Sequence, residues 1–469
     1  MVAITSRVSA ESSGRRLARK RLAAIASSAA TMLVLEAFFG GGYVSLVKGY
    51  IIAMMLDAGF SMRIISLVML LVYLGVLIGC QLAYRGATRL ESRVRSSLLA
   101  LHAGERIFYV LLPLALFIGG VYLFTIAYAL GEAMDVLVGA LLTYYILVLF
   151  DERGVRRVVG WRTSAGLIAT IIAHAAAASI LYAYPMPLRY FMVYGVAGLF
   201  AVASWLCIYM APLAGKPVAA RESNGGVEEE AKAATVFIVL ALGSLAGFLY
   251  GLGWQSYLLR VLRAPSYLVA VASLLSTAFI AVVAPLTAKA SFNVYRALIL
   301  AMPLAPLLTL AARSSIICIA LVPMFSLSST VVGFAAVSLY KRISGLNMVK
   351  LSLKLSSAMA LGNFLAMSIT YFLSLNPVGV LVASAIAAIA TGVVSLVAIE
   401  ELAVSPSERV RARARLLYYA SLATYRGVID VSETYVKTAA RLLLLVLLFS
   451  LLALVYRAAM ILAGLGAPH

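Results

Sequence analysis

The chain has 469 residues, of which 64% are hydrophobic and only 12% are charged, and its formal net charge is +20. Soluble domains contain about 45–50% apolar and about 25% charged residues, so this composition excludes a water-soluble fold. The basic residues lie in short segments between apolar runs, which is typical of membrane topology signals and argues against a nucleic-acid partner.

Apolar runs of about 20 residues, each long enough to cross about 30 Å of hydrocarbon, recur along the whole chain. We therefore predict an all-α polytopic membrane protein with thirteen spans. The spans lie at residues 23–55, 61–84, 107–127, 129–150, 164–184, 188–212, 234–253, 267–288, 294–312, 315–340, 355–374, 378–399 and 441–464. The basic residues 1–22 are expected on the cytoplasmic side of an uncleaved signal anchor.

The first span carries an acid and a base inside an apolar segment. Glu36 lies about 20 Å along the predicted helix, near the midplane of the bilayer. Lys48 lies about 18 Å further along the axis, so the two side chains cannot pair within one helix. The glycines between them, residues 40–42, indicate close helix packing more often than a helix break.

Three further ionisable residues lie in spans four and five. Glu132 and Asp135 are one helical turn apart on one face, where Lys48 would pair with them if spans one and four adjoin. His174 lies at the depth of Glu36 and is a candidate partner for it, since imidazole titrates near neutral pH. An isolated buried carboxylate takes up a proton, so Glu36 is predicted to couple transport to protons. The alternatives are that Glu132 faces outside water, Lys48 reaches outward to the interface, and His174 only packs between helices.

The second half of the chain has fewer candidate functional residues. Its predicted spans hold no acid, and Gln255 and Asn363 are the main polar candidates. The three cysteines lie in apolar runs and predict neither a disulfide nor a metal site; they are Cys80, Cys207 and Cys318. We find no catalytic motif and expect no enzyme activity and no cofactor.

The basic residues also predict the topology. With a cytoplasmic N-terminus, most lysines and arginines fall in cytoplasmic segments and the C-terminus lies outside the plasma membrane. Residues 53–71 and 259–277 are weakly similar and indicate a parallel repeat, a feature of transporters. The predicted parts are a basic N-terminus (1–22), a six-helix bundle (23–212), a cytoplasmic linker (213–233), a second six-helix bundle (234–399), a basic helical segment (400–440) and an extra transmembrane helix (441–469).

Two loops resemble the major facilitator superfamily of transporters. Its loop between spans two and three carries G-x-L-A-D-R-x-G-R-R, of which CQLAYRGATR at residues 80–89 keeps Leu82, Ala83, Arg85 and Arg89. Tyr84 stands where the family has an aspartate. DERGVRRVVG, residues 151–160, is similar to the family's loop after span four and keeps Arg156. The family's span-five antiporter motif is absent.

The resemblance implies two six-helix bundles around a central cavity, with Arg85, Arg89 and Arg156 in a cytoplasmic loop gate. Spans three, six, nine and twelve would support the others and, by our boundaries, hold no ionisable side chain in their interiors. We predict a monomeric secondary transporter that moves a small solute by alternating access, with lipids and protons as further partners. A lipid-linked oligosaccharide flippase and a non-transporting scaffold or secretion-platform subunit remain alternatives.

Overall fold

The computed structural model describes residues 27–86, 93–150, 152–212, 227–287, 292–340 and 348–398. The regular elements within these ranges are helices, and none is a strand. Ten of these helices are long and apolar enough to cross a membrane, and another apolar helix, Tyr267–Val283, is shorter. The predicted all-α multi-pass membrane protein is thus confirmed. The predicted segments 1–22, 400–440 and 441–469 lie outside the described residues, so the thirteenth span stays a prediction.

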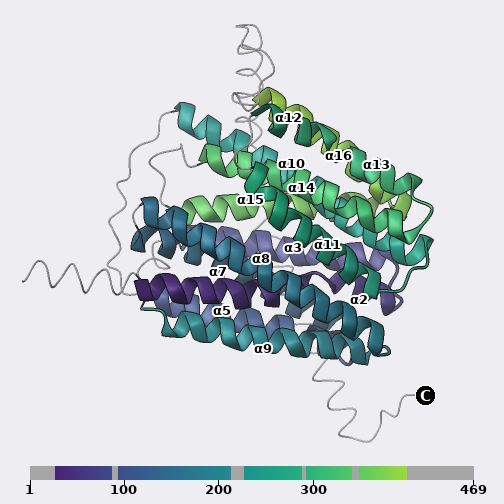
Figure 1. Cartoon of the computed structure of the whole chain (residues 1–469), viewed down its shortest axis with the longest axis horizontal. Coiled ribbons are helices and arrows are strands. Elements are labelled where there is room, and N and C mark those ends of the chain that lie inside the picture. The colour runs from purple at the N-terminus through teal and green to yellow at the C-terminus, as the bar shows by residue number, and fades with distance from the viewer. Residues whose placement is uncertain are drawn as a thin grey trace, which may run out of the picture.

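The helices up to Met210 pack on one another, and we call them the N-terminal bundle (Figure 1). The first of them, helix 27–48, is followed after a short turn by α2 (Ile51–Asp57). The others are α3 (Met62–Arg85), α5 (Val94–Val110), α6 (Leu112–Phe117), α7 (Gly120–Leu149), α8 (Glu152–Ala183) and α9 (Leu188–Met210). α7 packs against α3, α5 and α6, and helix 27–48 lies against α8 and α9 through its glycines.

The remaining described helices form the C-terminal bundle, shown above the first in Figure 1. They are α10 (Val227–Ser256), the π-helix η1 (Tyr257–Val261), α11 (Tyr267–Thr287), α12 (Phe292–Ala301), α13 (Leu304–Ala311), α14 (Ser315–Tyr340), α15 (Met348–Phe372) and α16 (Pro377–Ala398). α10 packs on α14, α15 and α16 and is the centre of this bundle. α10 begins at Val227, inside the predicted linker 213–233, whereas its candidate membrane span begins at Val236, after that linker.

The two bundles meet along a few helix pairs. α3 packs against α15, α8 packs against α11, and α7 also touches α15. At the end where α10 runs into η1, α2 contacts α10. Each bundle therefore has its own set of packed helices, and the two share a seam built mainly from the α3–α15 and α8–α11 pairs.

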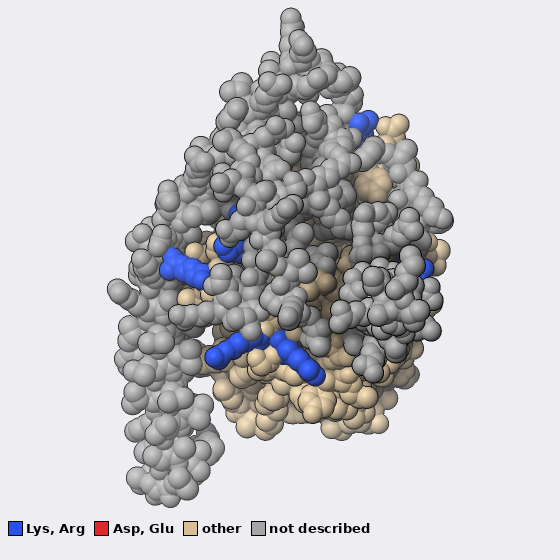
Figure 2. Space-filling model, turned by 90° about the vertical axis from the view of Figure 1, so that its left-hand side faces the viewer, with Lys and Arg blue, Asp and Glu red and all other residues tan. Residues whose placement is uncertain are grey.

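Basic side chains lie on the surface at the end where α10 begins (Figure 2). Figure 2 shows the molecule from this side, and the charged side chains of described residues visible there are lysines and arginines, with no acidic ones among them. This distribution agrees with the predicted cytoplasmic location of that end. The orientation in the membrane stays a prediction.

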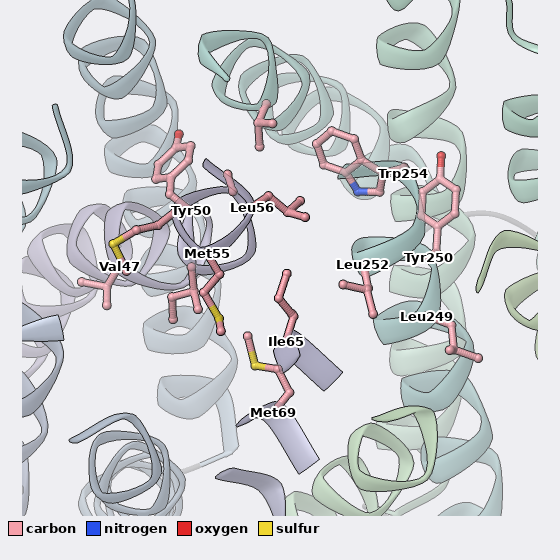
Figure 3. Close-up of a cluster of buried hydrophobic side chains, with 14 of the residues drawn as sticks. Val47, Tyr50, Met55, Leu56, Ile65, Met69, Leu249, Tyr250, Leu252 and Trp254 are labelled. Carbon is pink, nitrogen blue, oxygen red and sulfur yellow. The ribbon is translucent and has the colours of Figure 1, made fainter. Parts of the chain in front are cut away.

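A buried apolar cluster joins the bundles near α2. Figure 3 shows side chains of the N-terminal bundle facing side chains of α10. The labelled residues are Val47, Tyr50, Met55, Leu56, Ile65 and Met69 from the first bundle, and Leu249, Tyr250, Leu252 and Trp254 from the second. All of them belong to one cluster of buried residues, so apolar packing joins the two bundles at this end.

Two predicted span boundaries were wrong. The third span was placed at 107–127, but the structure has helix from Val94 to Val110, a short α6, and a new helix from Gly120. The fifth was placed at 164–184, but α8 begins at Glu152. Four residues assigned to loops therefore lie within helices of the N-terminal bundle; they are His102, Glu105, Arg106 and Arg162.

The glycines of the first span are used for close packing, as predicted. The helix continues through residues 40–42 without a break. A Cβ at Gly41 would lie 2.7 Å from the carbonyl oxygen of Gly166 in α8, and one at Gly42 would lie 2.6 Å from the ring of Phe200 in α9. Only a residue without a side chain lets helix 27–48 approach α8 this closely.

We expect Gly41→Ala to lower the stability of the protein by about 1–3 kcal/mol, because the new methyl group meets a backbone carbonyl that cannot turn aside. Thermal unfolding in detergent measures the change. Gly195→Ala in α9 is the matched control, since nothing lies within 4 Å of its added Cβ. Equal unfolding temperatures for the two variants would show that the helices do not need this close approach.

Candidate functional site

Lys48 joins two acids of α7. Its Nζ lies 2.7 Å from Oδ2 of Asp135 and also contacts Oε2 of Glu132. Asp135 lies three residues after Glu132, so both carboxylates project from the same face of α7 towards helix 27–48. The contact that the sequence allowed between spans one and four is present, and Glu132 and Lys48 are not free surface charges.

This triad is only partly enclosed by protein. The side chains of Lys48 and Asp135 are 28% and 30% exposed, whereas that of Glu132 is 7% exposed. The ring of Tyr109 in α5 lies beneath the ammonium group, with its centroid 5.5 Å from Nζ. Charged groups do not face hydrocarbon at this depth, so the exposed side of the triad faces water or another polar surface.

Glu36 has a base that the sequence analysis did not assign to it. Nη1 of Arg162 in α8 donates to Oε2 of Glu36 over 2.6 Å and also to the carbonyl oxygen of Leu33 at 2.6 Å. Glu36 is 4% exposed. The prediction that Glu36 is an isolated carboxylate was wrong, because Arg162 was placed in a loop and was never considered as its partner.

A second buried group of charges adjoins this ion pair on α5. Arg106 contacts Oε2 of Glu105 through Nη1 and donates to Oγ of Ser204 in α9 over 2.8 Å. Its guanidinium carbon lies 4.5 Å from the ring centroid of Tyr43. Nε2 of His102 lies 3.9 Å from Oε1 of Glu36 and so connects the two groups. The resulting set of Glu36, His102, Glu105, Arg106 and Arg162, with Ser204, is called the α5 charge cluster below.

The α5 charge cluster contradicts the expectation that the third span holds no ionisable side chain. His102, Glu105 and Arg106 are 1%, 1% and 6% exposed, although His102 had been assigned to a basic loop. A signal for them was present in the sequence. Residues 102, 105 and 106 follow the i, i+3, i+4 spacing that places side chains on one face of a helix.

His174 does not pair with Glu36. Its Nδ1 lies 2.6 Å from the hydroxyl of Tyr50, and the ring lies beside Gly49. Gly49 is about 20 Å from Glu36 along the helix axis. The predicted partnership was therefore wrong, and His174 instead makes the packing contact that was the alternative interpretation.

The two polar candidates of the second half lie apart from these charges. Gln255 is buried near the end of α10, and its Oε1 has no hydrogen-bond partner among the described residues. Asn363 is half-buried in α15 and interacts with the side chain of Tyr73 in α3. Asn363 therefore lies where the bundles meet, on the α3–α15 seam.

Part of the predicted loop gate lies outside the described residues. Arg89 falls in the gap between 86 and 93, and of Arg156 only its place in α8 is described. Arg85 ends α3. The neighbouring Tyr84, which replaces the family's aspartate, has its ring centroid 6.0 and 5.9 Å from Nζ of Lys350 and Lys354 in α15. An aromatic ring thus meets two cations between the bundles at this position.

Comparison with known proteins identifies the fold of this chain through solved structures, not through sequence matches. No family model matches the chain, and no curated protein matches it by sequence. The structure is similar to that of the nucleoside transporter NupG, with a TM-score of 0.55 and 13% identity over 81% of this chain and 100% of that one. It is similar to a D-xylose–proton symporter, with a TM-score of 0.60 and 12% identity over 78% and 96% of the two chains.

A POT family transporter, solved with a thioalcohol-conjugated peptide, is also similar, with a TM-score of 0.59 and 13% identity over 80% and 96% of the two chains. These proteins are transporters and not enzymes. The chain therefore has the fold of the major facilitator transporters, at a sequence divergence that leaves the solute undefined.

The ion pair between Glu36 and Arg162 gives a test of the site. We expect Glu36→Gln to lower stability by about 3–5 kcal/mol, because it leaves the arginine unpaired in a buried place. Glu36→Gln/Arg162→Gln should recover most of that loss in thermal unfolding. The control is Arg157→Gln, which changes an exposed arginine of the same helix. A double variant as unstable as the sum of the single variants would contradict the pairing.

Proposed function

We propose that this protein is a secondary active transporter that carries a small solute across the membrane by alternating access. The observation that supports this most is the pairing of two helical bundles along a shared seam, with a partly exposed triad of charged side chains inside one of them. Rocking of one bundle against the other would expose such groups to each side in turn. Transporters with the same fold support this activity.

One end of the seam is suited to open and close. Nη2 of Arg260 in η1 donates to the carbonyl oxygens of Leu56 and Phe60, over 3.1 and 3.0 Å. These two hydrogen bonds cross from one bundle to the other beside the apolar cluster of Figure 3. No charge is left unpaired when they break in contact with water, so the main cost of opening this end is the exposure of the apolar cluster.

The triad of Lys48, Glu132 and Asp135 is the proposed solute site. With all three ionised it carries one net negative charge, and one acid is 30% exposed. A cationic or zwitterionic solute would complement that charge, and the nearby Tyr109 ring would favour an ammonium group. Neutral solutes would gain hydrogen bonds but no charge complementarity.

Coupling through Glu36 alone loses its basis, because Glu36 is paired with Arg162 and is not an isolated carboxylate. The two rival functions make different demands. A lipid-linked oligosaccharide flippase would need a basic surface for pyrophosphate, whereas the exposed group here is an acidic triad. A scaffold or secretion-platform subunit would need no opening of the seam at all.

Cross-linking tests alternating access directly. The double variant Phe60→Cys/Arg260→Cys is cross-linked with a reducible bifunctional thiol reagent whose spacer has the length of an arginine side chain. The cross-link should stop solute movement in proteoliposomes, and reduction of the cross-link should restore it. The background chain has its three buried cysteines replaced by alanine. The single-cysteine chains, treated alike, control for modification and for loss of the arginine. Full activity in the cross-linked protein would rule out opening at this end.

Uptake assays test the solute class. We offer choline as a quaternary ammonium ion, glycine betaine as a zwitterion, glucose as a neutral sugar and lactate as an anion. Uptake of choline or glycine betaine is expected, and Asp135→Asn should lower kcat/KM about tenfold, as for loss of one charge-assisted hydrogen bond. Thr143→Val in the same helix is the control, because its hydroxyl bonds only the carbonyl of Gly139.

Uptake of lactate alone would contradict the assignment of solute class. The scaffold alternative would be favoured if none of the four solutes is taken up and the Phe60→Cys/Arg260→Cys variant still cross-links readily.

A further inference from the structure

We propose that His102 and Glu105 form the proton site of this transporter, taking up and releasing one proton as the bundles move. The proposal rests on the proposed transport function and replaces Glu36 as the coupling residue. The two side chains lie one turn apart on α5, and each is 1% exposed.

The first argument is the position of His102 between two carboxylates. Its Nε2 lies 3.9 Å from Oε1 of Glu36, and its Nδ1 lies 3.7 Å from Oε2 of Glu105. Neutral imidazole has one N–H donor, whereas protonated imidazole has one on each ring nitrogen. A protonated His102 would therefore have a carboxylate acceptor beyond both of its donors. Small side-chain shifts would bring both contacts to hydrogen-bond length.

The second argument is the set of unused polar atoms. Nδ1 of His102 and Oε1 of Glu105 are both buried without a hydrogen-bond partner among the described residues. Buried polar atoms are nearly always paired, so two unpaired ones on neighbouring side chains need an explanation. A proton added at Nδ1 of His102 would supply a donor for the Glu105 carboxylate, whose Oε2 lies 3.7 Å away. The proton then belongs to the pair rather than to either side chain alone.

The third argument is charge balance. Glu36 and Glu105 offset Arg106 and Arg162, so the cluster is neutral while His102 is neutral. Both arginines oppose a further positive charge, and both carboxylates favour it. Other groups that face the pair from surrounding helices are Tyr43 and Lys48 of helix 27–48, Asp135 of α7, and Ser204 and Cys207 of α9. One added proton thus changes the cluster from neutral to singly positive, in a place where water does not screen that change.

The fourth argument connects the proton to movement. The cluster joins helix 27–48, α5, α8 and α9, and helix 27–48 also carries Lys48 of the solute triad. α8 is one of the helices that meet the C-terminal bundle, through α11. A charge change that alters how α8 and helix 27–48 pack can therefore favour one arrangement of the bundles over the other.

Magnetic resonance of the wild-type protein tests the proton site. The full chain is isotope-labelled at the histidine ring nitrogens and studied in lipid vesicles over a pH series. It contains three histidines, and His174→Gln and His469→Gln assign the signals. We expect the His102 signal to change from a neutral tautomer to the protonated ring as the pH is lowered. His174, held by the Tyr50 hydroxyl, should not follow it. A His102 signal that stays neutral wherever the protein is folded would overturn the proposal.

Glu105→Gln distinguishes the pair from an isolated histidine. The titration of His102 should move by about one pH unit or more, the size expected on losing an adjacent carboxylate. An unchanged titration would remove Glu105 from the proton site. Since the wild-type titration needs no variant at position 105, a failure of Glu105→Gln to fold leaves the main test intact.

Distance measurements between spin labels at Ile64→Cys and Val261→Cys test coupling without any solute. Both positions are exposed and lie on different bundles at the end closed by Arg260. Acidification should shift the distance distribution in the otherwise wild-type chain, and His102→Gln should make it independent of pH. His174→Gln, which changes an equally enclosed histidine, should keep the shift. A pH-independent wild type, or a persistent shift in His102→Gln, would overturn the coupling.

These outcomes are separate from those that test transport. Cross-linking and uptake decide whether the bundles alternate and what they carry, whereas the histidine titration decides where the proton binds. A transporter driven by another ion would pass the first tests and fail the second.

Discussion

Charge neutralisation inside the membrane is the constraint on which the N-terminal bundle depends. An unpaired ionised group at the centre of a bilayer costs about 2.5–3.5 kcal/mol even on insertion scales. Helix 27–48 meets this constraint twice, with Glu36 against Arg162 of α8 and Lys48 against Glu132 and Asp135 of α7. Neither contact can form unless that helix lies between α7 and α8. The ion pairs therefore depend on this arrangement of the three helices and also stabilise it.

The C-terminal bundle is built differently. Where its side chains are described, it is held by apolar packing and small residues, as where Gly362 of α15 lies against the backbone of α10. Arg260 links it to Leu56 of α2 and to Phe60, with backbone carbonyls as the acceptors. The ion pairs described above thus lie within the N-terminal bundle, whereas the described contacts across the seam are hydrogen bonds, cation–aromatic contacts and apolar packing. Such a division suits rigid-body movement, because the seam can separate without breaking the ion pairs.

The sequence alone predicted the fold class and one of the two groups of charged side chains, the triad of Lys48, Glu132 and Asp135. Glu132 and Asp135 were found because a turn-spaced pair of acids inside an apolar run is conspicuous. The α5 charge cluster was missed for the same physical reason that makes it stable. Hydropathy counts each of Glu105, Arg106 and Arg162 as a cost and so moves them into loops, whereas in the folded bundle opposite charges offset one another. Glu105 and Arg106 are neighbours on α5, but Glu36 and Arg162 pair across two helices that lie far apart in the sequence.

The two charge groups together suggest how a proton and a solute would influence each other. The triad carries one net negative charge, and the α5 charge cluster is neutral until His102 is protonated. Glu105 interacts electrostatically with both Lys48 and Asp135, so the groups are close enough for charge in one to affect the other. Under the two proposals, either a proton or a cation alone brings the summed charge of the two groups to zero, and both together make it positive. In a medium of low dielectric constant that excess is costly, which favours exchange of a cationic solute for a proton over their joint transport.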